Sequence, residues 1–130
     1  MSAHENNFGL TRIGQIAITV RDIDRAVQFY QQTLGMKFLF RAPNLAFFDC
    51  GGIRLMLTVP EKGESDHPPS IVYYKVDDIG RAHAALVERQ VKFEGPPHLV
   101  ARLPDHELWM AFFRDMDGNL LALMSEVRSP

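Results

Sequence analysis

The sequence predicts an α+β protein built from two tandem βαβββ modules, and three observations lead to this prediction. The segment Val20–Ala26 returns 56 residues later as Val76–Ala82, with five of seven residues identical. A second repeat follows, since Ala46–Phe48 has the same three residues as Ala111–Phe113. In each copy a strand pattern precedes a helical pattern, and three further strand patterns follow. One half of the chain is therefore interpreted as a duplicate of the other.

The length of the chain bounds its domain organisation. With 130 residues, of which 46% are hydrophobic, the chain can bury one sizeable core but not two independent ones. We expect a single domain over residues 1–130, with the first module at about 11–60 and the second at about 71–127. The polar stretch at about 61–70, which contains Pro68 and Pro69, is expected to link them.

The first module has a signal for each element. Ile13–Val20 is rich in Ile and Val, which favours a strand, and Asp22 offers a side-chain oxygen to the free amides of a helix start. Apolar residues at three- and four-residue steps predict a helix from about Ile23, which ends at Gly35. Three strands, separated by residues typical of turns, are expected at Met36–Phe40, Leu45–Asp49 and Ile53–Val59.

The second module repeats this order. Ile71–Val76 is predicted as a strand, Asp78 as a helix cap, and Ile79 to about Gln90 as the helix. The pattern D-M-D-G-N at 115–119 is interpreted as a hairpin turn, because Asp and Asn favour turns and Gly118 accepts a positive φ. The remaining strands are expected near Val91–Phe93, Leu108–Phe113 and Leu120–Ser125.

The two modules differ most between their second and third strands, where the second copy has about ten additional residues within Gly95–Glu107. This insertion carries His98, Arg102, Asp105, His106 and Glu107. Imidazole titrates near neutral pH and carboxylates can tune it, so His98, His106 and Glu107 are candidates for acid-base catalysis or for a relocated metal site. The alternatives are surface histidines in a polar loop and an extension that covers a sheet edge.

Charge and composition argue against several classes of partner. The net charge is -2 and no basic cluster is present, which argues against nucleic acid and anionic membranes. The longest apolar runs, such as Leu120–Met124, are far shorter than the roughly 20 residues of a membrane span. A single cysteine, Cys50, and a start without the pattern of a secretory signal lead us to expect a cytoplasmic protein.

Over nearly its whole length, the chain resembles the vicinal oxygen chelate superfamily of glyoxalases, bleomycin-resistance proteins and ring-cleaving dioxygenases, and the stretches that carry the resemblance are Ile13–Gly35 and Phe112–Asn119. The resemblance implies curved mixed sheets around a central cavity, with the helices on the outer face. Many members of this superfamily hold one divalent metal ion in the cavity with four side chains, so the resemblance also implies four metal-ligand positions in this chain.

The metal-ligand positions implied by this resemblance fall on Gln15, Met56, Ile71 and Ala122. An aliphatic side chain has no lone pair, a thioether is a poor ligand for hard or borderline ions, and one neutral amide cannot hold such an ion alone. We therefore expect neither a metal nor another cofactor.

Alternation along the predicted strands assigns one apolar face to the helices and the opposite face to the cavity. A cavity lining of Met, Ile, Ala and Tyr with a few polar groups suits a partly apolar ligand, and a filled core is the alternative. The residues expected to bind the ligand are Gln15, Arg54, Met56, Ile71, Tyr73, Arg102, Trp109, Ala122 and Met124.

The functional prediction is a metal-free small-molecule-binding protein of the bleomycin-resistance type, which sequesters its ligand. A homodimer is what the resemblance implies. The alternative is a lyase, isomerase or epimerase of the glyoxalase kind that uses a relocated site in the 95–107 insertion. A structural or regulatory protein without a ligand is the third interpretation.

Overall fold

The computed structural model describes residues 8–9, 11–60 and 70–128 of the chain. The predicted linker falls almost entirely on residues 61–69, which lie outside the described residues. In the described part, no helix has the length and hydropathy that crossing a membrane requires.

Each half of the chain forms one four-stranded mixed sheet with a helical segment against it. The elements of the first module are β1 (Gln15–Thr19), α2 (Ile23–Gln28), the π-helical η1 (Phe29–Thr33), β2 (Lys37–Ala42), β3 (Leu45–Cys50) and β4 (Ile53–Thr58). Its strand order is β1-β4-β3-β2, with β1 parallel to β4 and the other pairs antiparallel.

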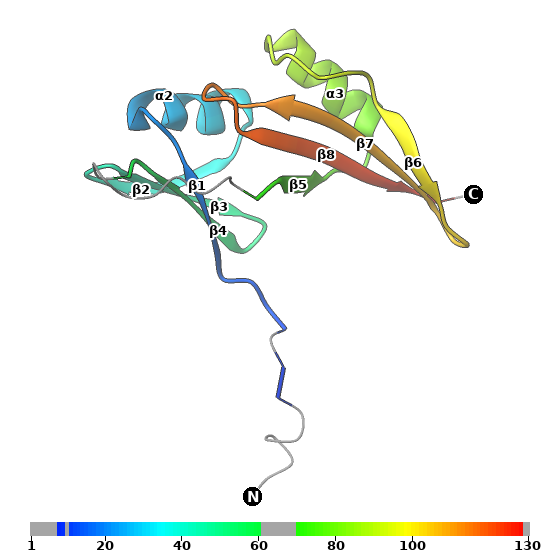
Figure 1. Ribbon diagram of the computed structural model, residues 1–130, viewed down its shortest axis with the longest axis horizontal. Coiled ribbons are helices and arrows are strands. Elements are labelled where there is room, and N and C mark those ends of the chain that lie inside the picture. The colour runs from blue at the N-terminus through cyan, green and yellow to red at the C-terminus, as the bar shows by residue number, and fades with distance from the viewer. Residues whose placement is uncertain (1–7, 10, 61–69, 129–130) are drawn as a thin grey trace, which may run out of the picture.

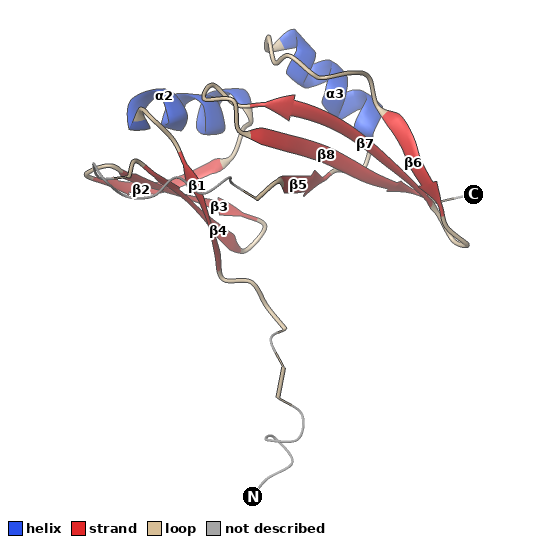
Figure 2. Cartoon of the chain, viewed as in Figure 1, coloured by secondary structure: helices blue, strands red, loops and turns tan. Residues whose placement is uncertain are grey.

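The second module repeats this arrangement with β5 (Val72–Lys75), α3 (Ile79–Glu88), β6 (His98–Arg102), β7 (Glu107–Arg114) and β8 (Leu120–Val127). Its strand order is β5-β8-β7-β6, and β5 is again parallel to β8. Figure 1 shows α2 and α3 on the same side of the two sheets, and Figure 2 separates this helical layer from the strands by colour. The predicted tandem βαβββ fold is confirmed, with two separate sheets that do not close into a barrel.

Both helices begin at the residues that the sequence predicts. The Asp22 carboxylate accepts hydrogen bonds from the amides of Asp24 at 2.9 Å and Arg25 at 3.2 Å. Asp78 accepts one from the amide of Arg81 at 3.0 Å. These bonds satisfy amides that have no partner within the helix.

The first helical segment changes its hydrogen-bonding period before it ends. The amide of Leu34 donates to the carbonyl of Phe29 at 2.9 Å, a spacing of five residues that defines the π-helical turn of η1. Gly35 then adopts a φ of +74°, a conformation that glycine accepts without a steric penalty, and the chain leaves the helix there.

The sequence prediction is wrong at the second strand of the second module. Val91–Phe93 is not a strand, because only Phe93 makes an isolated bridge, to Phe113. The second strand is β6, which lies inside the segment predicted as an insertion and pairs antiparallel with β7. Most of the additional residues therefore lie between α3 and β6, and the part of the predicted functional loop that carries His98, Arg102 and Glu107 belongs to the sheet.

Alternation along the strands separates the two faces of each sheet. We call the side that packs against α2 and α3 the helix face, and the opposite side the open face. The helix face supplies most of the buried core, whose strand residues include Ile18, Phe48, Leu55, Leu57, Phe113, Leu121 and Leu123. The resemblance implied curved sheets around a central cavity; in these unclosed sheets, several side chains of the open faces are exposed to solvent.

The turn between β7 and β8 connects the two modules. Asp115 is only 6% exposed, and its carboxylate accepts hydrogen bonds from the amides of Asp117 and Asn119, both at 2.9 Å. It also accepts one from the Asn119 side-chain amide at 2.8 Å and one from the Tyr30 hydroxyl of the first module at 2.9 Å. The same Asn119 nitrogen donates to the carbonyl of Thr19 at 3.0 Å. The predicted hairpin turn is confirmed, and it is also a contact between modules.

Candidate functional site

The open face of the first sheet brings together three of the predicted ligand-binding residues. In the parallel register of β1 and β4, Gln15 lies opposite Arg54 and Ala17 lies opposite Met56. The side-chain nitrogen of Gln15 donates to the sulfur of Met56 over 3.8 Å. The guanidinium carbon of Arg54 lies 5.8 Å from the ring centroid of Phe47, which is the geometry of a cation-π contact.

Phe47 extends this surface across the first sheet. It lies opposite Met56 on one side and opposite Phe40 on the other. The rings of Phe40 and Phe47 stack with their centroids 4.5 Å apart, and Phe40 is 49% exposed. The sequence-based site prediction omitted Phe40 and Phe47. The Phe47-Phe48 pair could have indicated Phe47, because adjacent side chains on a strand face opposite sides of the sheet and one of the two rings must lie on the open face.

The open face of the second sheet holds Tyr73, Ala122 and Met124. Tyr73 and Phe112 lie on either side of Ala122 in the ladder, and their rings meet edge to face with centroids 6.0 Å apart. Ala122 is completely buried. The His98 ring lies nearly parallel to Phe112, with centroids 6.2 Å apart. This sheet therefore also presents an aromatic surface, in which the small side chain of Ala122 lies between Tyr73 and Phe112.

The four positions that the resemblance assigns to metal ligands do not form a ligand set. Gln15 has the only polar side chain among them, and its amide nitrogen is directed at Met56. Ala122 is buried, and Ile71 immediately precedes β5. The cationic Arg54 lies opposite Gln15 and disfavours a second positive charge. The residues at these positions do not fit a divalent ion.

The rest of the described chain offers no replacement for that ligand set. Within residues 8–9, 11–60 and 70–128, no three His, Cys, Asp or Glu side chains are grouped so that they could hold one metal ion.

The structure does not place Arg102 and Trp109 beside the other predicted ligand-binding residues. Alternation along β7 places Glu107, Trp109 and the buried Ala111 on the helix face. The Trp109 indole donates to one Glu107 oxygen at 3.1 Å, and Arg102 donates to the other at 3.2 Å. The Trp109 hydrogen bond, and then that of Arg102, lower the pKa of the Glu107 carboxyl. A carboxylate held ionised in this way is poorly suited to be a general acid at neutral pH.

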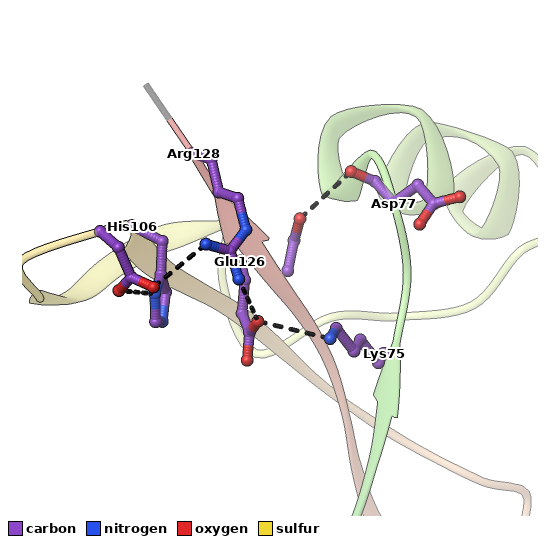
Figure 3. Close-up of polar contacts among 7 residues, drawn as sticks. Lys75, Asp77, His106, Glu126 and Arg128 are labelled. Atoms are coloured by element: carbon purple, nitrogen blue, oxygen red, sulfur yellow. Dashed lines mark hydrogen bonds and ion pairs between the residues drawn. The ribbon is translucent and has the colours of Figure 1, made fainter. Parts of the chain in front are cut away.

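His106 belongs to a chain of polar side-chain contacts at the end of the second sheet (Figure 3). Its Nδ1 lies 2.8 Å from one Asp105 oxygen, and Arg128 donates to the other at 3.1 Å. Arg128 and Lys75 lie 4.0 and 3.3 Å from the same Glu126 oxygen. The hydrogen bonds from His106 and then Arg128 lower the pKa of Asp105. These contacts are exposed, and we interpret them as surface electrostatics of small energetic weight.

The three candidate catalytic residues occupy three separate surroundings. His98 lies beside Phe112 on the open face, His106 is bonded to Asp105, and Glu107 is bonded on the helix face. In the described part of the chain, no hydrogen bond joins any two of the three.

Comparisons with known proteins agree with this fold. The profile of the Glyoxalase/Bleomycin resistance protein/Dioxygenase superfamily matches residues 12–123. YraH of Bacillus subtilis (strain 168) is 29% identical over 127 residues, which covers 84% of this chain and 94% of YraH. The metallothiol transferase FosB of Lysinibacillus sphaericus (strain C3-41) is 30% identical over 67 residues, which covers 52% of this chain and 45% of FosB.

Solved structures show the same architecture. A superfamily member from Sphaerobacter thermophilus superposes with a TM-score of 0.75 at 27% identity, covering 90% of this chain and 98% of the other. The lactoylglutathione lyase of Agrobacterium tumefaciens superposes with a TM-score of 0.73 at 23% identity, covering 89% and 94%, which supports the fold alone. Because the profile spans most of the sequence, this chain belongs to the glyoxalase/bleomycin resistance protein/dioxygenase superfamily.

Proposed function

We propose that this protein binds a small, partly apolar molecule on its open face without a metal ion, in the manner of bleomycin-resistance proteins. The observation that carries the proposal is the pair of aromatic surfaces on that face, Phe40 with Phe47 and Tyr73 with Phe112. These rings lie on the same face as the positions that the family resemblance assigns to metal ligands. Among those positions, the neutral amide of Gln15 is the only polar side chain. Aromatic lining with few polar groups is typical of ligand pockets.

Polar side chains at the edge of this surface would orient the ligand. Arg54 lies over Phe47, so a planar molecule stacked on the rings would lie beside a guanidinium donor. The nitrogen of the Gln15 side chain is engaged by Met56, which leaves its carbonyl oxygen as an acceptor. Binding of this kind needs no proton transfer and no covalent step.

The open face is also where we place a second copy of the chain. Phe40 is 49%, Tyr73 42% and Ile71 38% exposed, and apolar surface of this kind marks interaction sites. Because the sheets do not close, one copy leaves the ligand surface uncovered, whereas a homodimer would enclose it between copies. We place this dimer in the cytoplasm, since the one cysteine, Cys50, suits a reducing compartment.

The dimer is tested by placing a charge on the open face. We expect the wild-type protein to sediment at twice its 14.8 kDa chain mass, and Phe40→Glu to sediment as a monomer, because a buried unpaired carboxylate opposes association. Val87→Glu is the matched control, since Val87 is 48% exposed but lies on α3. A monomeric wild type, or equal effects of the two substitutions, would exclude this interface.

Ligand binding is tested by a thermal-shift screen of planar aromatic compounds, with metal analysis of the same preparation. A ligand at a hundred times its Kd stabilises the native state by about 2.7 kcal/mol, which raises the Tm by several degrees. We expect Phe47→Ala to abolish the shift and Val87→Ala to leave it intact. Added divalent ions are expected to leave the Tm unchanged.

The competing function is an enzyme of the glyoxalase kind, and the partial similarity to FosB, named a metallothiol transferase, is the observation in its favour. It requires a metal or an acid-base group near the open face, and His98 is the candidate that lies there. A stoichiometric divalent ion that is lost in His98→Ala or Gln15→Ala would replace our proposal with this one. Absence of any ligand-induced shift would favour a structural role.

A further inference from the structure

The open face of the first sheet is organised in rows that cross its four strands, on the side turned away from α2 (Figure 1). Residues that lie opposite one another in the strand registers share a row. One row, which we call the polar row, contains in the order β2, β3, β4 and β1 the residues Lys37, Asp49, Arg54 and Gln15. The neighbouring row, which we call the apolar row, contains in the same order Phe40, Phe47, Met56 and Ala17.

The polar row has an excess of positive charge. Lys37 and Arg54 are cationic, Asp49 is anionic and Gln15 is neutral, which leaves one positive charge uncompensated within the row. Asp49 lies between the two cations in the ladder, so its carboxylate is shared by both neighbours. An anion that approaches this row is therefore attracted on balance.

The open face of the second sheet has no such excess in its described strands. The Lys75 ammonium lies 3.3 Å from a Glu126 oxygen, and the Arg114 guanidinium lies 3.4 Å from a Glu94 oxygen. The lysine and the arginine of this face are thus each balanced by a carboxylate. The uncompensated charge of the open face lies on the first sheet, beside Phe40 and Phe47.

Arg54 is placed where a ligand can use this charge. It is exposed, and within residues 8–9, 11–60 and 70–128 its guanidinium forms no ion pair, although Asp49 lies opposite in the ladder. The guanidinium carbon lies instead 5.8 Å from the centroid of the Phe47 ring. A guanidinium has five N–H donors in one plane, two of which can bind both oxygens of a carboxylate.

We propose that the ligand of the open face is an aromatic acid, whose ring stacks on Phe40 and Phe47 while its carboxylate accepts hydrogen bonds from Arg54. This inference rests on the proposed function and adds the chemical class of the ligand. Residues two apart on a strand are separated by roughly 7 Å, which is the spacing of the two rows. That spacing is comparable to the distance from the far ring of a naphthoate to its carboxylate.

The charge pattern of the polar row also selects against the opposite class of ligand. An aromatic amine would have to place its ammonium at Asp49, where it meets Lys37 on one side and Arg54 on the other. An aromatic acid placed at the Arg54 end of the row is opposed by Asp49 alone. The row therefore favours an acid over an amine with the same ring system.

The ligand class is tested by calorimetric titration with three probes that share one ring system: 2-naphthoate, the neutral 2-naphthamide and the cationic 2-naphthylmethylammonium. We expect naphthoate to bind with the lowest dissociation constant. Arg54→Gln should raise the ratio of the naphthoate to the naphthamide dissociation constant by about fivefold, the upper range for a partly exposed ion pair. Loss of ring packing affects both probes equally and cancels in this ratio. Because Arg54 is exposed, the variant should fold normally.

Two further charge variants are matched to Arg54→Gln. Arg41→Gln removes the same charge from the helix face of the same sheet, where Arg41 pairs with Asp24 of α2 at 2.7 Å, and should leave the ratio unchanged. Asp49→Asn removes the carboxylate of the polar row and should lower the ratio by about twofold, since naphthoate is then no longer repelled.

The possible failures of this inference and of the proposed function can be told apart. An unchanged ratio in Arg54→Gln, an equal change in Arg41→Gln, or tighter binding of the ammonium probe than of naphthoate overturns the aromatic acid and leaves the proposed function in place. Binding of none of the three probes overturns both.

Discussion

Replacing Phe48 by alanine is expected to lower the free energy of unfolding by about 3–5 kcal/mol, measured by urea denaturation. Phe48 is completely buried on the helix face of β3. Its ring meets Phe38 edge to face with centroids 5.6 Å apart, and Tyr30 at 6.2 Å. Truncation removes these contacts and leaves a cavity that the rigid sheet cannot close, so the cost exceeds that of transferring the lost atoms to water.

Phe47→Ala is the matched control, because it makes the same change one residue earlier on the open face. Phe47 is only partly buried, and we expect this variant to lose about 1 kcal/mol, mainly from its stack with Phe40. It should nevertheless lose the binding of aromatic ligands. Equal destabilisation by the two substitutions would contradict the assignment of Phe47 to the accessible side, and with it the proposed ligand surface.

The parts of the fold that could be predicted from the sequence are those with local causes. Asp22 and Asp78 cap their helices through amides two or three residues away, and Gly35 ends the first helical segment through its own φ. Because the two copies share the aspartate cap and the residues around it, the tandem arrangement followed from the repeat.

Strand β6 could not be predicted, because its formation depends on a distant partner. His98–Arg102 has no strong alternation, whereas Val91–Phe93, with Lys92 between two apolar residues, alternates as a strand does. Only pairing with β7 decides between them. Arg102 was assigned to the ligand site because it was expected on a loop, and its place in the ladder directs it to Glu107 instead.

The contact between the two modules lies further from what the sequence can predict. Tyr74 lies on the helix face of β5, but alternation along a strand cannot tell whether a hydroxyl there finds an acceptor. That depends on how η1 and α3 approach one another. One contact between them is the hydrogen bond from Arg89 to the carbonyl of Thr33, 2.9 Å long and 56 residues apart in sequence.

Loss of the Asp115 carboxylate is expected to be the most damaging polar substitution. In Asp115→Ala the amides of Asp117 and Asn119 and the hydroxyl of Tyr30 lose their acceptor together. Hydrogen bonds to a charged group each contribute about 1.5–3 kcal/mol, but they are not additive, so we expect a loss of about 3 kcal/mol in urea denaturation. Because the bond to Tyr30 crosses between modules, both modules should unfold in one transition at the lower midpoint.

Two further variants show whether the inter-module bond carries this effect. Asp117→Ala removes a carboxylate from the same turn whose contact also crosses between modules but is exposed, a hydrogen bond from the amide of Arg21 at 2.7 Å, and it should cost less than about 1 kcal/mol. Tyr30→Phe removes only the hydroxyl, and combining it with Asp115→Ala should cost less than the sum of the two, since both break the same bond. Strict additivity would mean that Asp115 stabilises only its own turn. The modules would then be held together by their other contacts, among them the apolar ones around Tyr30, whose ring is completely buried.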